Sequence, residues 1–291
     1  NPASAGFFYI WTKPLTLQAF MRSFCSIILV VFLAAGCSKF AKVQKSTDYD
    51  YKLRMADQYY AKKKYNQAQQ LYEELFPLLK GNDKFENVYY NFAYCAYYQR
   101  DYMNAENLFK GFTEVFPTSK RAEEMEYMRA YTYYKQSPKV ELDQTNTSRT
   151  IGLMQAFINT HPGSEKNKEA TEIMDKCRVK LELKEAKSAD LYYNLRQYKA
   201  SAIAYENLMN NFPDSQKSDE YKLQIIKSYY EYAGFSVEEK KEQRYQKVVE
   251  QCNEFTDRFP ESKLKKDVER LYNSSQNNLK AIKNEQVKTP A

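Results

Sequence analysis

Four segments of the 291-residue chain repeat one pattern around a proline. In each segment a large apolar residue lies five positions before the proline, and a serine lies two positions after it. The prolines are 45, 51 and 47 residues apart, and they are Pro117, Pro162, Pro213 and Pro260, with a weaker relative of the pattern at Pro77. A repeat of this period predicts an array of helical units that bury their apolar faces against one another.

The residues before each proline fit one face of a helix. Ala105, Phe109 and Phe112 lie at positions i, i+4 and i+7 of that face. The same places are held elsewhere by Ala68, Tyr72 and Leu75; by Thr150, Met154 and Phe157; by Ser201, Tyr205 and Leu208; and by Val248, Cys252 and Phe255. A small residue lets a partner helix approach, and the large residues fill the interface. Proline ends the helix, and we expect the following serine to cap the next one.

A second amphipathic segment precedes each of these helices. The segments are Asp50 to Lys63, Phe85 to Gln99, Arg121 to Lys135, Lys180 to Arg196 and Glu220 to Ala233, and small residues recur in them at Ala56, Ala93, Ala130 and Ala189. The small and large positions match those of tetratricopeptide repeats (TPRs), although the spacing exceeds the ~34 residues of a plain TPR. The sequence predicts an all-α fold, a right-handed superhelix of about five TPR-like helix pairs whose first helices line a concave groove.

Tyrosine is unusually abundant, with 27 copies, and it forms doublets on the expected first helices. Adjacent helical residues point about 100° apart, so we expect one tyrosine of a doublet to pack in the core while the other faces the groove. Most of the tyrosines are explained by packing. The remainder are candidates for an aromatic floor that binds peptides, and we select Tyr60, Tyr90 and Tyr98.

The apolar run near the N-terminus has the three zones of an export signal. Met21 and Arg22 precede the apolar stretch SFCSIILVVFLAAG. Its centre spans about a dozen residues, whereas a membrane-spanning helix needs roughly 20. We therefore predict a signal peptide that starts at Met21, with residues 1–20 as upstream translation.

Gly36 and Cys37 follow two alanines, and this resembles the lipobox of bacterial lipoproteins. The match departs at Ala34, where the usual residue is leucine. The resemblance implies that the Cys37 thiol carries diacylglycerol and becomes the first residue after cleavage; Ser38 next to it is compatible with transfer to the outer membrane. The predicted organisation is an extension and signal over residues 1–36, a lipidated tether over 37–50, the helical domain over 51–275 and a flexible tail over 276–291.

Sequence motifs for catalysis, cofactors or metals are missing. The chain has no glycine-rich phosphate loop and no G-x-S-x-G. His161 takes the place of a phenylalanine in the sister repeats, which favours a packing or turn role, and Cys95, Cys177 and Cys252 are interpreted as buried thiols. We predict no enzyme activity, no cofactor and no metal site.

The formal net charge of +7 is spread over mixed patches typical of solvated helix faces. The chain also lacks an aromatic and basic RNA-binding signature. We therefore predict no nucleic-acid partner.

Two stretches resemble the BamD family of outer-membrane lipoproteins. EYMRAYTYY, at Glu126 to Tyr134, is similar to the family's Y-M-R-G, with Ala130 for the glycine. The stretch from Ser188 to Ser215 resembles the family's fourth repeat, with its Y-Y pair and closing P-D-S. The abundance of Tyr, Asn and Lys is typical of a Bacteroidetes version.

The resemblance implies a non-enzymatic scaffold on the periplasmic side of the outer membrane. C-terminal repeats would dock on a POTRA domain of BamA, beside other subunits of the β-barrel assembly machine, and N-terminal repeats would receive unfolded β-barrel proteins. The motif carries Tyr127 and Arg129 as candidate partner-binding residues, for which a structural role stays open, and Arg196 is a candidate for docking.

Two other functions are also compatible with the sequence. A TPR lipoprotein that acts as an adaptor for peptidoglycan or division enzymes would more often have plain 34-residue repeats or an added coiled coil. SusD-like glycan-binding lipoproteins also combine TPRs with aromatic residues, but they are much longer, with large insertions between helices.

Overall fold

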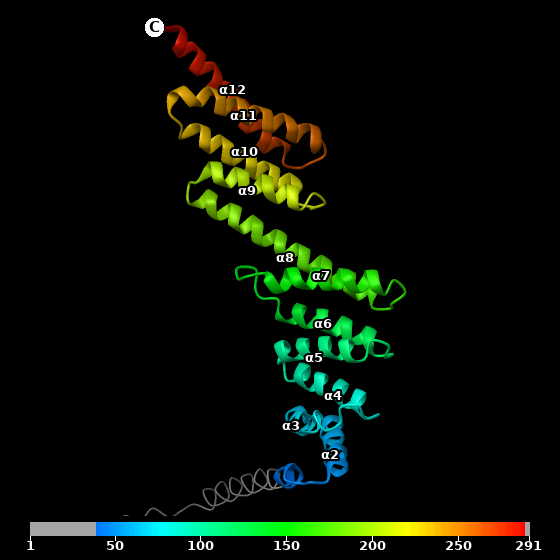
Figure 1. The fold of residues 1–291 in the computed structure, drawn as a ribbon. Coiled ribbons are helices and arrows are strands. Elements are labelled where there is room, and N and C mark those ends of the chain that lie inside the picture. Colours follow the sequence, from blue (N-terminus) through cyan, green and yellow to red (C-terminus); the bar gives the residue numbers. More distant parts are fainter. Residues whose placement is uncertain (1–38, 289–291) are drawn as a thin grey trace, which may run out of the picture. The chain divides into compact units, whose positions relative to one another are not determined.

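The computed structural model describes residues 39–288, in which every regular element is a helix. The chain divides after Met125 into two compact units. Helices of the first unit are α2 (Tyr49–Ala61), α3 (Tyr65–Leu75), α4 (Phe85–Tyr98) and α5 (Tyr102–Val115). The all-α class predicted from the sequence is confirmed (Figure 1).

Helix α6 (Ala122–Gln136) begins in the first unit and continues in the second. The second unit then contains α7 (Thr145–Thr160), α8 (Asn167–Asn194), α9 (Tyr198–Asn211), α10 (Ser218–Gly234), α11 (Glu238–Arg258) and α12 (Lys265–Lys288). Neighbouring helices such as α8 and α9, or α10 and α11, run side by side in opposite directions (Figure 1). The five expected pairs are α2 with α3, α4 with α5, α6 with α7, α8 with α9 and α10 with α11.

The core of each pair is built from the predicted small and large positions. All fifteen residues named for the second helices are at most 2% exposed, and the four alanines of the first helices are fully buried. Tyrosine fills a large position in two pairs, and its hydroxyl needs a partner there. Tyr72 donates to Asp57 at 2.6 Å, and Tyr205 donates to Asp190 in the same way. A carboxylate of the first helix thus satisfies the buried hydroxyl of the second.

Each repeated proline fixes the end of a helix through the residue before it. Proline excludes that residue from the helical region, and all four such residues have φ between −129° and −122° and ψ between 59° and 65°. His161 is one of them, at the end of α7. Its ring lies 5.0 Å from that of Phe157, and Nε2 lies 2.8 Å from Glu126 Oε2. The turn and packing interpretation of His161 is confirmed.

The serine after each proline holds the turn between two pairs instead of capping the next helix directly. Its Oγ accepts the backbone N–H two residues on, at 3.0 to 3.1 Å in all four turns, and the next helix begins three residues after it. The expected N-cap role is wrong in this respect. Three serines also donate to a carboxylate on the preceding first helix, in the contacts Ser119 to Glu86 (2.7 Å), Ser215 to Glu182 (2.6 Å) and Ser262 to Asp219 (2.6 Å).

Two helix boundaries differ from those expected. Helix α8 begins at Asn167 instead of Lys180, because nothing between Asn167 and Asn194 breaks a helix: the stretch has no glycine or proline. Helix α12 continues to Lys288, and Leu279 packs with Ala233 and Tyr245, so the structure has a helix where the sequence suggested a tail from residue 276.

The end of the expected tether also contributes to the first core. Residues 39–44 are helical, Val43 is buried, and the Phe40 ring meets that of Tyr59 edge-on at 5.7 Å. Asp48 then caps α2 by accepting the Tyr51 N–H at 2.8 Å. The chain is therefore packed on the first unit from about residue 40 onward.

The serine contact predicts a stability loss on Ser215→Ala. The change removes the bond to Glu182, which also accepts from Tyr221 at 2.7 Å, and the bond from the Lys217 N–H. We expect a loss of about 1–2 kcal/mol in the free energy of unfolding, measured by urea denaturation. Ser148→Ala, on an exposed face of α7, is the matched control, and equal midpoints for the two variants would contradict the proposed link.

Candidate functional site

Five tyrosines of the first unit form a row of contacting rings, which we call the tyrosine ladder: Tyr60, Tyr65, Tyr98, Tyr94 and Tyr90. Ring centroids of successive members lie 5.7, 4.5, 5.7 and 4.8 Å apart. The closest pair, Tyr65 and Tyr98, is stacked with an interplanar angle of 22°. The ladder brings together all three tyrosines selected from the sequence for peptide binding.

Helix geometry explains the row. Tyr90, Tyr94 and Tyr98 are four residues apart on α4, so they lie on one face of the helix. Tyr60 is in the last turn of α2 and Tyr65 opens α3, so the short connection between these helices places both rings beside the end of α4. The i, i+4 spacing of Tyr94 was visible in the sequence, whereas nothing in the sequence signalled Tyr65.

Charged groups order the other end of the ladder. Glu124, in the first turn of α6, accepts hydrogen bonds from the hydroxyls of Tyr90 (3.1 Å) and Tyr94. The Arg121 guanidinium lies 4.3 Å from the centroid of the Tyr90 ring, a cation–π contact. Burial, and after it the hydrogen bond to Glu124, raises the pKa of Tyr94 well above its usual value. Its hydroxyl therefore stays protonated and donates.

The ladder suits stacking and apolar contact. Tyr98 is 47% exposed, and the rings of Tyr60, Tyr65 and Tyr90 are half-buried. Side-chain amides lie beside them: Asn66 donates to Gln99 at 3.3 Å, and Gln99 donates to the Cys95 carbonyl at 3.1 Å. A surface with aromatic faces and adjustable amides can hold an extended peptide by ring contacts and by bonds to its backbone.

The other residues selected from the sequence lie in the second unit. Tyr127 is 3% exposed and packs edge-on against Phe157 at 5.5 Å, so its ring is part of the core, the structural role that the sequence left open. Arg129 is half-buried on α6.

Arg196 is exposed and follows α8 with φ 59°, in the left-handed region. Lys63 and Arg100 take the same conformation (φ 57° and 64°) at the turns between α2 and α3 and between α4 and α5. Glycine is the usual residue for this backbone conformation. Three equivalent turns therefore present a basic side chain at a position where the fold itself favours glycine.

The described residues offer little reactive chemistry. Within residues 39–288 no group of acidic, histidine or cysteine side chains has a metal-binding arrangement, and none of the helices there is long and apolar enough to cross a membrane. Cys95, Cys177 and Cys252 are buried free thiols, as expected, and burial raises the pKa of Cys95 to about 12. Cys37 and the signal segment lie outside the described residues.

Several solved structures of helical-repeat proteins are similar to the chain. One is a TPR protein from Bacteroides fragilis, with 14% identity and a TM-score of 0.39 over 80% of this chain and 99% of that one. Another is the TPR2AB domain of yeast Sti1 in its complex with pHSP90, with 14% identity and a TM-score of 0.37 over 78% and 98%. A third is a TPR protein from Thermus thermophilus, with 15% identity and a TM-score of 0.30 over 78% and 98%. The search of curated proteins found no match.

Paired helices with an aromatic surface define a helical-repeat protein of the kind that binds other proteins. The sequence model of the YfiO family, described as an outer membrane lipoprotein, matches residues 49–246. The chain belongs to this family, and the resemblance to BamD noted in its motifs is confirmed.

The raised pKa of Tyr94 predicts a loss of stability in alkali. The folded pKa lies above the unfolded value of about 10, so the stabilisation is complete below that pH and is lost as the pH rises above it. We expect the free energy of unfolding to fall between about pH 9 and pH 11, and to fall by about 1 kcal/mol less in Tyr94→Phe. Urea denaturation across this range measures both, with Tyr49→Phe at an exposed position as the control. A fall as steep in Tyr94→Phe as in the unsubstituted chain would contradict the assignment.

Proposed function

We propose that this chain is a lipid-anchored scaffold of the β-barrel assembly machine on the periplasmic face of the outer membrane. In this role it binds BamA and unfolded segments of β-barrel proteins and promotes their insertion, without catalysis of its own. The observation that carries the proposal is the tyrosine ladder, a row of aromatic rings with Tyr98 exposed to solvent, on a chain of the YfiO family.

The ladder fits the chemistry of an unfolded barrel segment. Strands of membrane barrels carry aromatic residues in their girdles and alternate apolar with polar side chains. An extended segment could stack an aromatic side chain on the exposed ring of Tyr98 while Asn66 and Gln99 bond its backbone. Such contacts depend little on the sequence of the bound segment, which a scaffold that binds many different β-barrel proteins requires.

The predicted anchor would hold this surface close to the membrane. Phe40 already contacts Tyr59 of the first unit, and it lies three residues after Cys37. Three residues span at most about 11 Å, so a lipid on Cys37 would keep the first unit near the bilayer surface. Several acyl chains make such attachment stable, since each buried CH₂ contributes about 0.8 kcal/mol.

Docking on BamA is proposed for the second unit, with Arg196 as the contact. Its guanidinium is exposed at a turn where glycine would suit the backbone better. Residues kept in sparsely populated conformations cluster at functional sites. An acidic group on the POTRA domain would form the charge-assisted bond that arginine favours.

Capture of partners from detergent-solubilised membranes tests the proposal. The full chain should recover BamA. Recovery of peptidoglycan or division enzymes without BamA would favour the adaptor function, and recovery of a glycan importer would favour the SusD-like one.

Arg196→Gly refines the same experiment, because glycine adopts the left-handed conformation without strain and the fold should be retained. We expect BamA recovery to fall about tenfold. Arg100→Gly changes the equivalent turn of the first unit and should leave recovery unchanged. Equal recovery with both variants would contradict a docking role for Arg196.

A further inference from the structure

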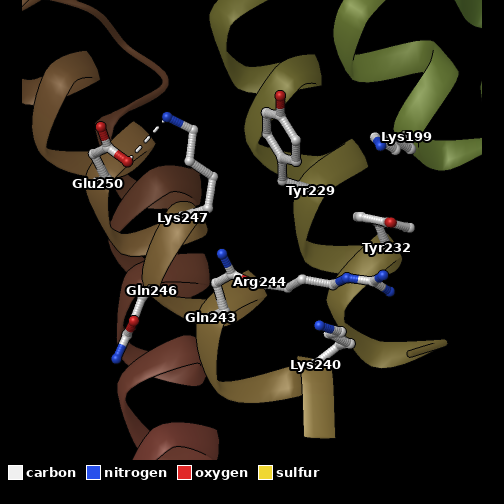
Figure 2. A pocket seen from close by; sticks show the side chains of 9 residues that line it. All are labelled: Lys199, Tyr229, Tyr232, Lys240, Gln243, Arg244, Gln246, Lys247 and Glu250. Carbon is white, nitrogen blue, oxygen red and sulfur yellow. Dashed lines mark hydrogen bonds and ion pairs between the residues drawn. The ribbon is translucent and has the colours of Figure 1, made fainter. Parts of the chain in front are cut away.

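A hollow of about 600 Å³ lies among α9, α10 and α11 of the second unit. Figure 2 shows the side chains that line it, with Lys199 from α9, Tyr229 and Tyr232 from α10, and Lys240 and Arg244 from α11. Its volume is in the range of ligand-binding pockets, about 300–1,000 Å³. The tyrosine ladder, in contrast, belongs to the first unit.

One end of the hollow is positively charged without compensation. Lys199, Lys240 and Arg244 make no ion pair with a carboxylate of residues 39–288, whereas Lys241, the neighbour on the same helix, is paired with Glu238. The three cations come from two helices and line the same space (Figure 2). An anion placed between them would be attracted by all three, because no carboxylate there neutralises their charge.

Arg244 is held in place for such an anion. Its guanidinium lies 3.9 Å from the centroid of the Tyr232 ring, and Nη1 donates to the Ser236 hydroxyl, which in turn donates to the Tyr232 carbonyl at 2.5 Å. The remaining N–H groups of the guanidinium are available in a fixed plane. That geometry matches the two oxygens of a carboxylate.

The residues around the hollow include ion-paired, acidic and apolar side chains. At its other end Lys247 is paired with Glu250 at 2.9 Å, and the Tyr229 hydroxyl donates to Glu206 at 2.9 Å. On the turn between α10 and α11, Phe235 and Val237 are 69% and 64% exposed. Cations, aromatic walls and an apolar rim thus adjoin one another.

We propose that this hollow is a docking site for an acidic segment of a partner protein, whose carboxylate binds Arg244 between Lys199 and Lys240 and whose neighbouring apolar side chain rests on Phe235. An inserted side chain reaches the cations inside a hollow, whereas a flat anionic membrane does not. Glu250 and Glu206 would also repel such a membrane. The inference stands on this geometry and is independent of the proposed role in barrel assembly.

Peptide binding to the full, detergent-solubilised chain tests the site. The probe is a short fluorescein-labelled peptide of alternating glutamate and serine with one central phenylalanine, followed by fluorescence anisotropy. We expect saturable binding that weakens with added salt, and a Kd raised about tenfold by Arg244→Gln. Lys241→Gln removes the same charge from the same helix outside the hollow and should leave the Kd unchanged.

Two further measurements distinguish an acidic peptide from an anionic membrane as the occupant of the hollow. A peptide with glutamine for glutamate should not bind, and vesicles of anionic phospholipid should show no difference between the unsubstituted chain and Arg244→Gln. Equal Kd values for the unsubstituted chain and Arg244→Gln would overturn the proposal, as would equal losses in the two variants. Vesicle binding that depends on Arg244, in the absence of peptide binding, would assign the hollow to the membrane and also overturn it.

Discussion

The turn after each second helix is the constraint on which the rest of the structure depends. Proline denies a helical conformation to the residue before it, so α5, α7, α9 and α11 all end in the same backbone geometry. The serine that follows holds the turn through its Oγ and, in three turns, binds a carboxylate of the preceding first helix. One short motif thus ends the second helix of a pair and ties the turn after it to the first helix of the same pair.

Because each first helix packs against its second helix on one face, its other side chains can contact neighbouring helices or a partner. On α4 the buried face includes Ala93 and Phe92, while Tyr90, Tyr94 and Tyr98 form the ladder with rings from α2 and α3. The basic hollow has a comparable origin. Helix α10 packs against α9 and α11 through apolar residues, and the three helices line the hollow with Lys199, Tyr232 and Arg244. Two surfaces with different chemistry therefore arise from one repeated unit.

The sequence predicted the core well because the core obeys a local period. Ala105, Phe109 and Phe112 and their counterparts were identified from spacing alone, and they are buried in every pair. Two boundaries were missed: α8 begins soon after the turn at Pro162, earlier than expected, and α12 continues past residue 276 because no proline or glycine ends it there. Of the ladder, Tyr60, Tyr90 and Tyr98 were selected from their doublets, but Tyr65 and Glu124 join through contacts between elements far apart in sequence. Such contacts have no local signal, and the same is true of the hollow around Arg244.

Site-specific photo-crosslinking in cells tests most directly whether the tyrosine ladder receives unfolded barrel segments. A photoreactive phenylalanine analogue replaces Tyr98 in the ladder or, as the control, Met103, which is 73% exposed on α5 outside the ladder. We predict that newly made β-barrel proteins are crosslinked at position 98 and not at position 103. Equal crosslinking at both positions, or none at position 98 while BamA is still captured, would contradict it.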